Sequence, residues 1–323
     1  MTKPLLEIKE LRTSFFTDDG IMPSVDGASL TVNEGEVVGL VGESGCGKTV
    51  MSLSVIRMIA HPGKIVSGEI LFKGENLIEY SEEQMRKIRG SGIGMIFQDP
   101  LTSLNPVFNI ADLMATPLML HKKIDRKQAM ALAVEMLAKV GIASPEKRIM
   151  EYPHQFSGGQ RQRISIATAL ALNPSLLIAD EPTTALDVSI QAQILDLLTG
   201  LQKELNTSMI FISHNLGVIS GISHKVAVMY GGWIVEEAPV KELFTNPCHP
   251  YTKALLEAIP TIEGGDRRLK NLPGQPPTVG EVIPGCRFSS RCPDMIKGVC
   301  DTSPPADFIT GEKHRVRCHL FVN

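Results

Sequence analysis

The sequence lacks the features of a membrane-spanning or secreted chain. Its 323 residues contain no apolar run that approaches the roughly 20 residues a transmembrane helix needs. The first residues mix acidic side chains into the apolar positions, unlike a signal peptide. We therefore expect the chain to stay in the cytosol and to act at a membrane only through a partner.

The sequence also has little that would favour nucleic acid as a partner. No long basic block occurs, and the formal net charge is -3. Internal repeats and low-complexity tracts are absent. With 323 residues, the chain can form one large or two modest domains around an ample core.

The most informative stretch runs from Val37 to Thr49, where an apolar run breaks into a glycine-rich turn with the pattern G-x-x-x-x-G-K-[ST]. The residues of this turn are Gly42, Glu43, Ser44, Gly45, Cys46, Gly47, Lys48 and Thr49. Between a strand and a helix, such glycines let backbone N–H groups wrap a phosphate at the positive helix N-terminus. We expect Lys48 to reach the β- and γ-phosphates and Thr49 to ligate Mg²⁺. A chance match is the alternative.

Several polar residues each follow a short apolar run that is typical of a buried strand: Gln98, the pair Asp180 and Glu181, and His214. Strands alternate with helices along the chain, which predicts a mainly parallel core sheet with its ligand at the carboxyl ends of the strands. The alternatives are a capping or loop role for Gln98, a salt bridge for Glu181 and simple packing for His214.

Strand signals stop after Gln98 and resume near Leu176. From Arg126 to Val140, apolar residues recur at helical spacing. We therefore expect a helical subdomain at about residues 99–170, inserted into the α/β core. It ends on Ser157, Gly158, Gly159 and Gln160 at a helix start, which is a second place suited to an anion.

The order of these motifs resembles that of the nucleotide-binding subunits of ABC transporters. The matching segments are Gly42–Thr49 (Walker A), Gln98 (Q-loop), Phe156–Gln160 (signature motif, with Phe where Leu is usual), Leu176–Glu181 (Walker B and its adjacent glutamate), Ala185–Asp187 (D-loop) and His214 (switch histidine). The resemblance implies an α/β fold with a P-loop NTPase core of the ABC type over residues 1–240.

The resemblance also implies a mechanism. Two such domains meet head to tail, so that each ATP lies between the Walker A motif of one and Ser157–Gln160 of the other. Glu181 would be the general base for the attacking water. Asp180 would hold Mg²⁺ together with Thr49.

Three further residues complete the expected ATP site. His214 would contact the γ-phosphate and orient the attack. Gln98 would sense Mg²⁺ and water and link the site to a membrane partner. An aromatic residue before the phosphate loop could stack on the base; we favour Phe15 for this role, with a place in the core as the alternative.

The rest of the chain resembles one subfamily. Residues 246–256 resemble the His-Pro-Tyr motif that opens the C-terminal region of oligopeptide and dipeptide importer ATPases, and residues 99–106, 272–277 and 284–288 fit the same subfamily. This implies a C-terminal extension over residues 241–323. It also implies an ATPase subunit at the cytoplasmic face of the membrane that powers import of dipeptides or oligopeptides.

The implied partners are a second ABC ATPase subunit, either a homologue or a second copy, two transmembrane permease subunits and, indirectly, an extracytoplasmic peptide-binding protein. Two alternatives remain open. One is an importer of nickel or another small solute in the same subfamily. The other is a soluble ABC ATPase acting on nucleic acid or ribosomes, a class that commonly has two fused cassettes or a long coiled coil, which this sequence lacks.

Four of the six cysteines lie in the tail with the spacing C-x5-C-x7-C-x17-C: Cys286, Cys292, Cys300 and Cys318. In a cytosolic chain, this clustering favours metal or cluster ligation over disulfides. The C-x2-C knuckles typical of zinc are absent, whereas the wider spacing suits a [4Fe–4S] cluster. We predict a small irregular module at about residues 284–319 that holds such a cluster. Zinc and free thiols are the alternatives.

Overall fold

The computed structural model describes residues 4–184, 186–258, 274–277, 281 and 283–322. They form two compact units. The first contains the described residues of 33–36 and 79–210, and the second contains the described residues of 4–32, 37–78 and 211–322. Among the described residues, no helix combines the length and apolarity needed to cross a bilayer.

The core sheet of the second unit has the strand order β11, β12, β10, β9, β3. Within it, β3 (Val37–Val41) pairs in parallel with β9 (Lys225–Tyr230), and β10 (Trp233–Pro239) runs antiparallel to β9. Every side chain of β3 is buried, as expected for a continuous apolar run in a parallel sheet. Gly231 and Gly232 form the turn between β9 and β10.

A second, antiparallel sheet of this unit has the order β2, β1, β4, β5. Its strands are β1 (Pro4–Thr17), β2 (Gly20–Asn33), β4 (Gly63–Phe72) and β5 (Glu75–Asn76). Strand β4 begins at Gly63, because its pairing with β1 continues to Phe15 opposite Gly63. Helix α1 (Lys48–Val55) ends shortly before Arg57, which adopts a left-handed conformation with φ of 52°.

The tail is more regular than predicted. Strands β11 (Asp307–Gly311) and β12 (His314–Arg317) form an antiparallel pair, and β12 continues the pairing onto β10, with Val316 opposite Glu236. The prediction of a small irregular module was therefore wrong for residues 307–317, which contain these two strands. Strand β12 has one aliphatic side chain, Val316, among three basic residues, so it gives no strand signal by apolar alternation.

An aromatic cluster joins the tail to this unit. It contains Tyr230 of β9, His249, Tyr251 of α11 (Pro250–Glu257) and Phe288, each at most 1% exposed. The Phe288 ring centroid lies 5.2 Å from that of Tyr230 and 5.4 Å from that of Tyr251, within the range of favourable ring pairs. Helices α9 (Leu216–Ile222) and α10 (Val240–Thr245) complete the unit.

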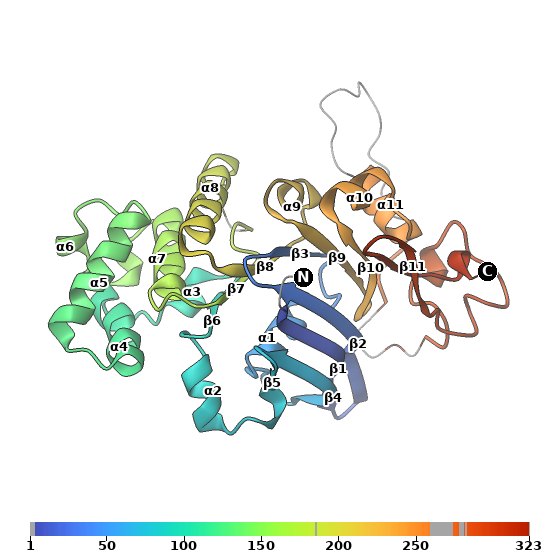
Figure 1. Ribbon diagram of the computed structural model, residues 1–323, viewed down its shortest axis with the longest axis horizontal. Helices are drawn as coiled ribbons and strands as arrows, with labels where there is room; N and C mark the ends of the chain where they lie inside the picture. The colour runs from blue at the N-terminus through green and yellow to red at the C-terminus, as the bar shows by residue number, and fades with distance from the viewer. Residues whose placement is uncertain (1–3, 185, 259–273, 278–280, 282, 323) are drawn as a thin grey trace. The chain divides into compact units, whose positions relative to one another are not determined.

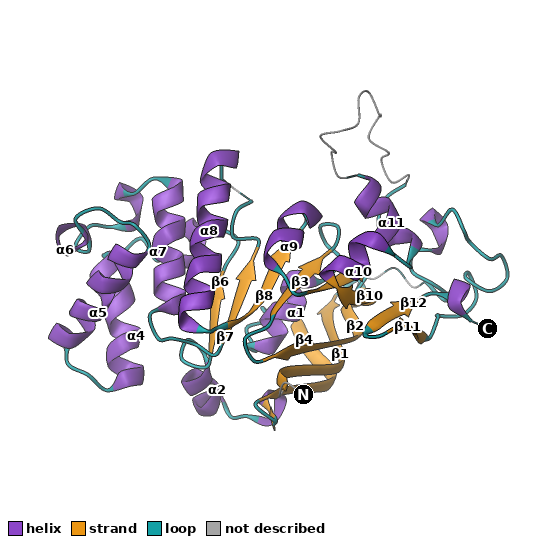
Figure 2. Cartoon of the chain, turned by 45° about the horizontal axis from the view of Figure 1, so that its top comes forward, coloured by secondary structure: helices purple, strands orange, loops and turns teal. Residues whose placement is uncertain are grey.

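In the first unit, β6 (Ile93–Ile96) and β7 (Leu176–Asp180) lie side by side in parallel (Figure 2). Figure 1 shows α4, α5 and α7 packed as neighbours in this unit. Its helices are α2 (Glu82–Ile88), α3 (Pro100–Ser103), α4 (Ile110–Lys122), α5 (Arg126–Lys139), α6 (Pro145–Arg148), α7 (Gly158–Leu170) and α8 (Val188–Leu205). Strand β8 (Ser208–Ser213) crosses into the second unit.

Loss of the Phe288 ring should destabilise the second unit. We expect Phe288→Ala to lower the free energy of unfolding by about 3–5 kcal/mol, because it leaves a cavity among buried rings. Phe16→Ala is the matched control: this ring is 41% exposed, so its loss should change the free energy by no more than about 0.5 kcal/mol. Chemical denaturation measures both values, and equal effects would contradict a shared aromatic core.

Candidate active site

The phosphate loop connects β3 to α1, and two of its glycines, Gly42 and Gly47, have no room for a side chain. Gly42 and Gly47 have φ values of 156° and 106°. A Cβ atom on Gly42 would lie 2.1 Å from the Met229 carbonyl oxygen, and one on Gly47 would lie 2.4 Å from that of Ser24. The glycines of the motif are therefore required by close backbone approach as well as by their torsion angles.

The loop surrounds a lysine. Lys48 is only 6% exposed, and its Nζ donates hydrogen bonds to the carbonyl oxygens of Gly42 at 2.8 Å and Glu43 at 2.9 Å. Burial raises the pKa of the neighbouring Cys46 thiol, which keeps that side chain neutral. The positive charge thus lies inside a ring of loop backbone, while Thr49, the next residue, is exposed at the helix start.

Two tail residues hold the phosphate loop. The hydroxyl of Tyr251 accepts a hydrogen bond from the Glu43 N–H at 2.9 Å. Arg291 donates from Nη1 and Nη2 to the two Glu43 carboxylate oxygens at 2.7 and 3.0 Å, and Nη1 also donates to the Tyr230 hydroxyl at 3.1 Å. The bond to Glu43 raises the pKa of Arg291 above its usual value.

This Arg291–Glu43 pair is the strongest kind of side-chain contact. A planar guanidinium matches a carboxylate in two parallel bonds, which fixes orientation as well as distance. The Arg291 side chain is 4% exposed, so water hardly competes for these bonds. Sequence reasoning missed Arg291, because its partner lies 248 positions away and no motif links the two.

In the first unit, the structure brings together Gln98 and Glu181. The Glu181 Oε2 atom accepts hydrogen bonds from Gln98 Nε2 at 3.2 Å and from the Thr184 hydroxyl at 2.7 Å. Asp180, the preceding residue, ends β7 and is 2% exposed. Glu181 has a left-handed backbone, with φ of 44°, which is costly for a residue other than glycine. Sequence reasoning did not identify Thr184.

The signature segment forms the start of α7. The Ser157 hydroxyl accepts from the Gln160 N–H at 3.3 Å, and Gln160 Oε1 accepts from the Ser157 N–H at 3.2 Å, which is a capping box. Ser157 is exposed and Gly158 and Gly159 are half-buried, so this helix start is open to solvent. Phe156 is buried, and the Arg148 guanidinium covers its ring at 4.2 Å from the ring centroid.

The remaining predicted residues are placed as follows. Phe15 is half-buried on β1, whereas Phe16 is exposed. His214 is exposed and directly follows β8. Ala185 of the D-loop and residues 272 and 273 of the tail lie outside the described residues. The base-stacking and γ-phosphate roles therefore stay predictions.

The four tail cysteines are free thiols. Cys286, Cys300 and Cys318 are buried, and Cys292 is half-buried. Burial raises the pKa of Cys286 and of Cys292 to about 11, and repulsion from neighbouring thiols adds to this rise: from Cys318 and Cys300 on Cys286, and from Cys286 and Cys318 on Cys292. The backbone brings two of the four together, because the Cys286 N–H donates to the Cys300 carbonyl oxygen at 2.7 Å.

Two family models match the chain. The model described as "ABC transporter" matches residues 25–184, which include the phosphate loop, Gln98, the signature segment and Glu181. The model described as "Oligopeptide/dipeptide transporter, C-terminal region" matches residues 235–300, which include Tyr251 and Arg291.

Curated relatives are similar over almost the whole chain. A probable peptide ABC transporter ATP-binding protein of Sinorhizobium fredii is 48% identical, with 93% of this chain and 90% of the relative covered. The oligopeptide transport ATP-binding protein OppD of Bacillus subtilis is 48% identical, with coverage of 98% and 88%. The dipeptide transport ATP-binding protein DppD of the same organism is 45% identical, with coverage of 98% and 94%.

Solved structures confirm the predicted fold class. A dimeric ATP-binding cassette in a post-hydrolysis state, bound to ADP and Pi, has a TM-score of 0.66 and 26% identity, with 73% of this chain and 98% of that chain covered. The cbiO1 protein of Clostridium perfringens, part of an ABC transporter complex, has a TM-score of 0.63 and 29% identity, with coverage of 75% and 91%.

Breaking the tail's hold on the phosphate loop should weaken nucleotide binding. We expect Arg291→Ala to lower MgATP affinity by about tenfold, or 1.4 kcal/mol, because Glu43 loses its bidentate partner and the loop becomes less ordered. Arg315→Ala is the control: this tail arginine pairs with Glu237 and Asp307 and makes no contact with the loop. Calorimetric titration measures both affinities; if both variants bind like the wild type, the tail does not position the loop.

Proposed function

Because the chain belongs to the ABC transporter family, we propose that it is the ATP-hydrolysing subunit that powers import of dipeptides or oligopeptides. The named peptide-transport relatives align over nearly all of the chain, so the likeness includes the tail as well as the ATPase core. The match of residues 235–300 to the oligopeptide/dipeptide C-terminal region supports this substrate class. No observation favours a nickel importer or an ATPase that acts on nucleic acid or ribosomes.

The observation that carries hydrolysis is the environment of Glu181. Its carboxylate follows the buried Asp180 directly and is oriented by hydrogen bonds from Gln98 and Thr184. A carboxylate held in this way can accept a proton from water as water attacks the γ-phosphate. Gln98, which already contacts this carboxylate, would orient the same water and transmit the state of the site to a membrane partner.

We assign nucleotide binding to the phosphate loop. The residues of this loop are Gly42, Glu43, Ser44, Gly45, Cys46, Gly47, Lys48 and Thr49, and its backbone N–H groups and Lys48 Nζ would hold the phosphates. The Thr49 hydroxyl and the Asp180 carboxylate are oxygen ligands of the type that Mg²⁺ prefers. Bound Mg²⁺ would neutralise charge on the phosphates. Phe15 would contact the base.

We further infer a head-to-tail pair of ABC ATPase chains, with a homologue or with a second copy. The open start of α7, from Ser157 to Gln160, offers N–H groups to an anion on another chain. The similar cassette with ADP and Pi bound was solved as a dimer. His214, exposed at the end of β8, would contact the γ-phosphate.

The pair would dock on two transmembrane permease subunits at the cytoplasmic face of the membrane and receive peptide indirectly from an extracytoplasmic binding protein. In this assignment, residues 1–240 form the ATPase domain, with the helical subdomain at about residues 99–170. Residues 241–323 form the extension, which includes the four-cysteine module at about residues 284–319.

For that module we propose a [4Fe–4S] cluster held by Cys286, Cys292, Cys300 and Cys318. The support is chemical: four free thiols, three of them buried, repel one another on ionisation and would be stabilised by bound iron. Their cysteine-only donor set also suits zinc, which is the alternative. The cluster would have a structural or regulatory role.

Replacing the general base tests the hydrolytic assignment. We expect Glu181→Gln to bind MgATP with wild-type affinity but to hydrolyse it about 10²–10⁴ times more slowly, because the amide cannot accept the proton. Glu204→Gln, which removes an exposed carboxylate paired with Lys139, should leave the rate unchanged. Phosphate release measures the hydrolysis rate, and calorimetric titration measures the affinity for MgATP. A wild-type hydrolysis rate in Glu181→Gln would show that Glu181 is not the general base.

Metal analysis after anaerobic purification tests the cluster. We expect about four iron and four sulfide ions per chain in the wild type and a loss of both in Cys286→Ser. Cys248→Ser, which removes a tail thiol outside the four, should retain them. Absence of stoichiometric iron from the wild type would count against the cluster, and stoichiometric zinc lost in Cys286→Ser would establish the alternative.

A further inference from the structure

A buried carboxylate lies where three segments of the second unit meet. Glu236 of β10 is 1% exposed. Its Oε1 accepts hydrogen bonds from the Cys248 N–H at 2.7 Å and from His314 Nε2 at 2.8 Å, and its Oε2 accepts from the His249 N–H at 2.9 Å. The backbone bonds from the turn before α11 therefore fix this carboxylate in one orientation.

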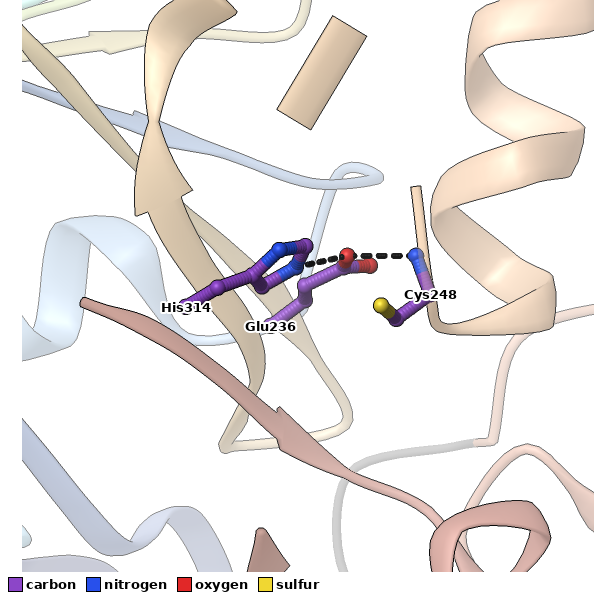
Figure 3. Close-up of side chains that lie close together, drawn as sticks. All are labelled: Glu236, Cys248 and His314. Atoms are coloured by element: carbon purple, nitrogen blue, oxygen red, sulfur yellow. Dashed lines mark hydrogen bonds and ion pairs between the residues drawn. The ribbon is translucent and has the colours of Figure 1, made fainter. Parts of the chain in front are cut away.

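Three different metal-binding atoms converge on this point. A Glu236 carboxylate oxygen, the Cys248 sulfur and a His314 ring nitrogen all lie within 4.8 Å of one another (Figure 3). Glu236 and His314 are nearly fully buried, whereas Cys248 is half-buried. Water and ions can thus reach the cluster from the side of the sulfur, while the other two donors are held in place by β10 and β12.

A second carboxylate lies near His314, beyond hydrogen-bond distance. The second ring nitrogen of His314, Nδ1, lies 3.8 Å from Glu242 Oε1 on α10. Metal-bound histidines usually donate their other N–H to such a carboxylate, which fixes the tautomer and the ring orientation. With the proton on Nδ1 facing Glu242, the Nε2 lone pair faces Glu236 and can bind a cation.

We propose that Glu236, Cys248 and His314 form a zinc site. Sulfur, imidazole nitrogen and carboxylate oxygen together suit Zn²⁺, whereas Mg²⁺ and Ca²⁺ prefer oxygen alone. Bonds of about 2.0–2.1 Å to nitrogen and oxygen would widen the Nε2–Oε1 contact from 2.8 Å to about 3.3 Å, a small side-chain shift. Water or the Thr310 hydroxyl, 3.6 Å from the sulfur, completes the four ligands.

Proton balance follows from these ligands. Zinc displaces the proton on His314 Nε2 that bonds Glu236, and this proton moves to Nδ1 of the His314 ring. The Cys248 thiol releases its proton to solvent. Binding therefore releases one proton per ion and becomes stronger as the pH rises. The site uses none of the four cysteines of the module, although His314 lies between Cys300 and Cys318 in the sequence, and it does not depend on the transported substrate.

The proposed ion would also support the phosphate loop. Cys248 lies three positions before Tyr251, whose hydroxyl accepts the hydrogen bond from Glu43. Zinc would tie the start of α11 to β10 and β12 and so restrict the movement of Tyr251. Glu236, Cys248 and His314 thus act on the nucleotide site through structure and not through contact with ATP.

Alkylation of Cys248 tests the site directly, with peptide mass mapping to separate this thiol from the other five. We expect Zn²⁺ to slow the reaction of iodoacetamide with Cys248 by about tenfold or more, because a zinc-bound thiolate is a weaker nucleophile than a free one. A chelator should restore the rate. In His314→Gln the protection should disappear, whereas in Glu237→Gln, which alters the neighbouring carboxylate of β10, it should persist.

Metal content gives a second readout that needs no disruptive variant. Cys248→Ser is close to isosteric, and it should contain one zinc fewer per chain than the wild type while keeping whatever the four-cysteine module holds. Cobalt(II) added to both proteins should give a thiolate charge-transfer band that is stronger in the wild type than in Cys248→Ser, by the contribution of one thiolate ligand. Equal alkylation rates with and without Zn²⁺, or equal zinc content in Cys248→Ser and wild type, would overturn the proposal.

Discussion

The ion pair between Glu43 and Arg291 connects the phosphate loop to the C-terminal region. The Arg291 side chain is 4% exposed and that of Glu43 is 25% exposed, and the pair is supported by the hydroxyl of Tyr230 and by the ring cluster around Phe288. Removing Glu43 would leave the Arg291 charge buried and uncompensated, so the pair strongly constrains both segments. The conformation of a glycine-rich loop, which has little stiffness of its own, is thus set by residues almost 250 positions away.

The same arrangement explains how a small, cysteine-rich tail keeps its fold. A segment of this size buries too little apolar surface to be stable by itself. Here it shares the core of a larger unit: Phe288 packs on Tyr230 and Tyr251, and β12 extends the sheet through β10. The extension is therefore a structural part of the nucleotide-binding unit, and a substitution that destabilises one should destabilise the other.

Local features of the sequence predicted much of the fold and the site. Strands β3 and β7 are continuous apolar runs, and the phosphate loop follows from its pattern. Contacts between distant residues were not predictable, because no pattern in the sequence around Arg291 or Glu236 indicates which residue it contacts. Strand β12 was missed for a related reason: its stability comes from pairing with β10 and not from its own composition.

The left-handed backbone at Glu181 has a consequence for how this position can vary. Glycine, and to a lesser degree asparagine, would adopt φ of 44° with less strain than glutamate. Selection for stability alone would therefore favour glycine or asparagine at this position, and the proposed role of Glu181 as general base supplies the opposing selection for a carboxylate. Under that proposal, a gene copy released from ATP hydrolysis should lose this glutamate early and gain stability.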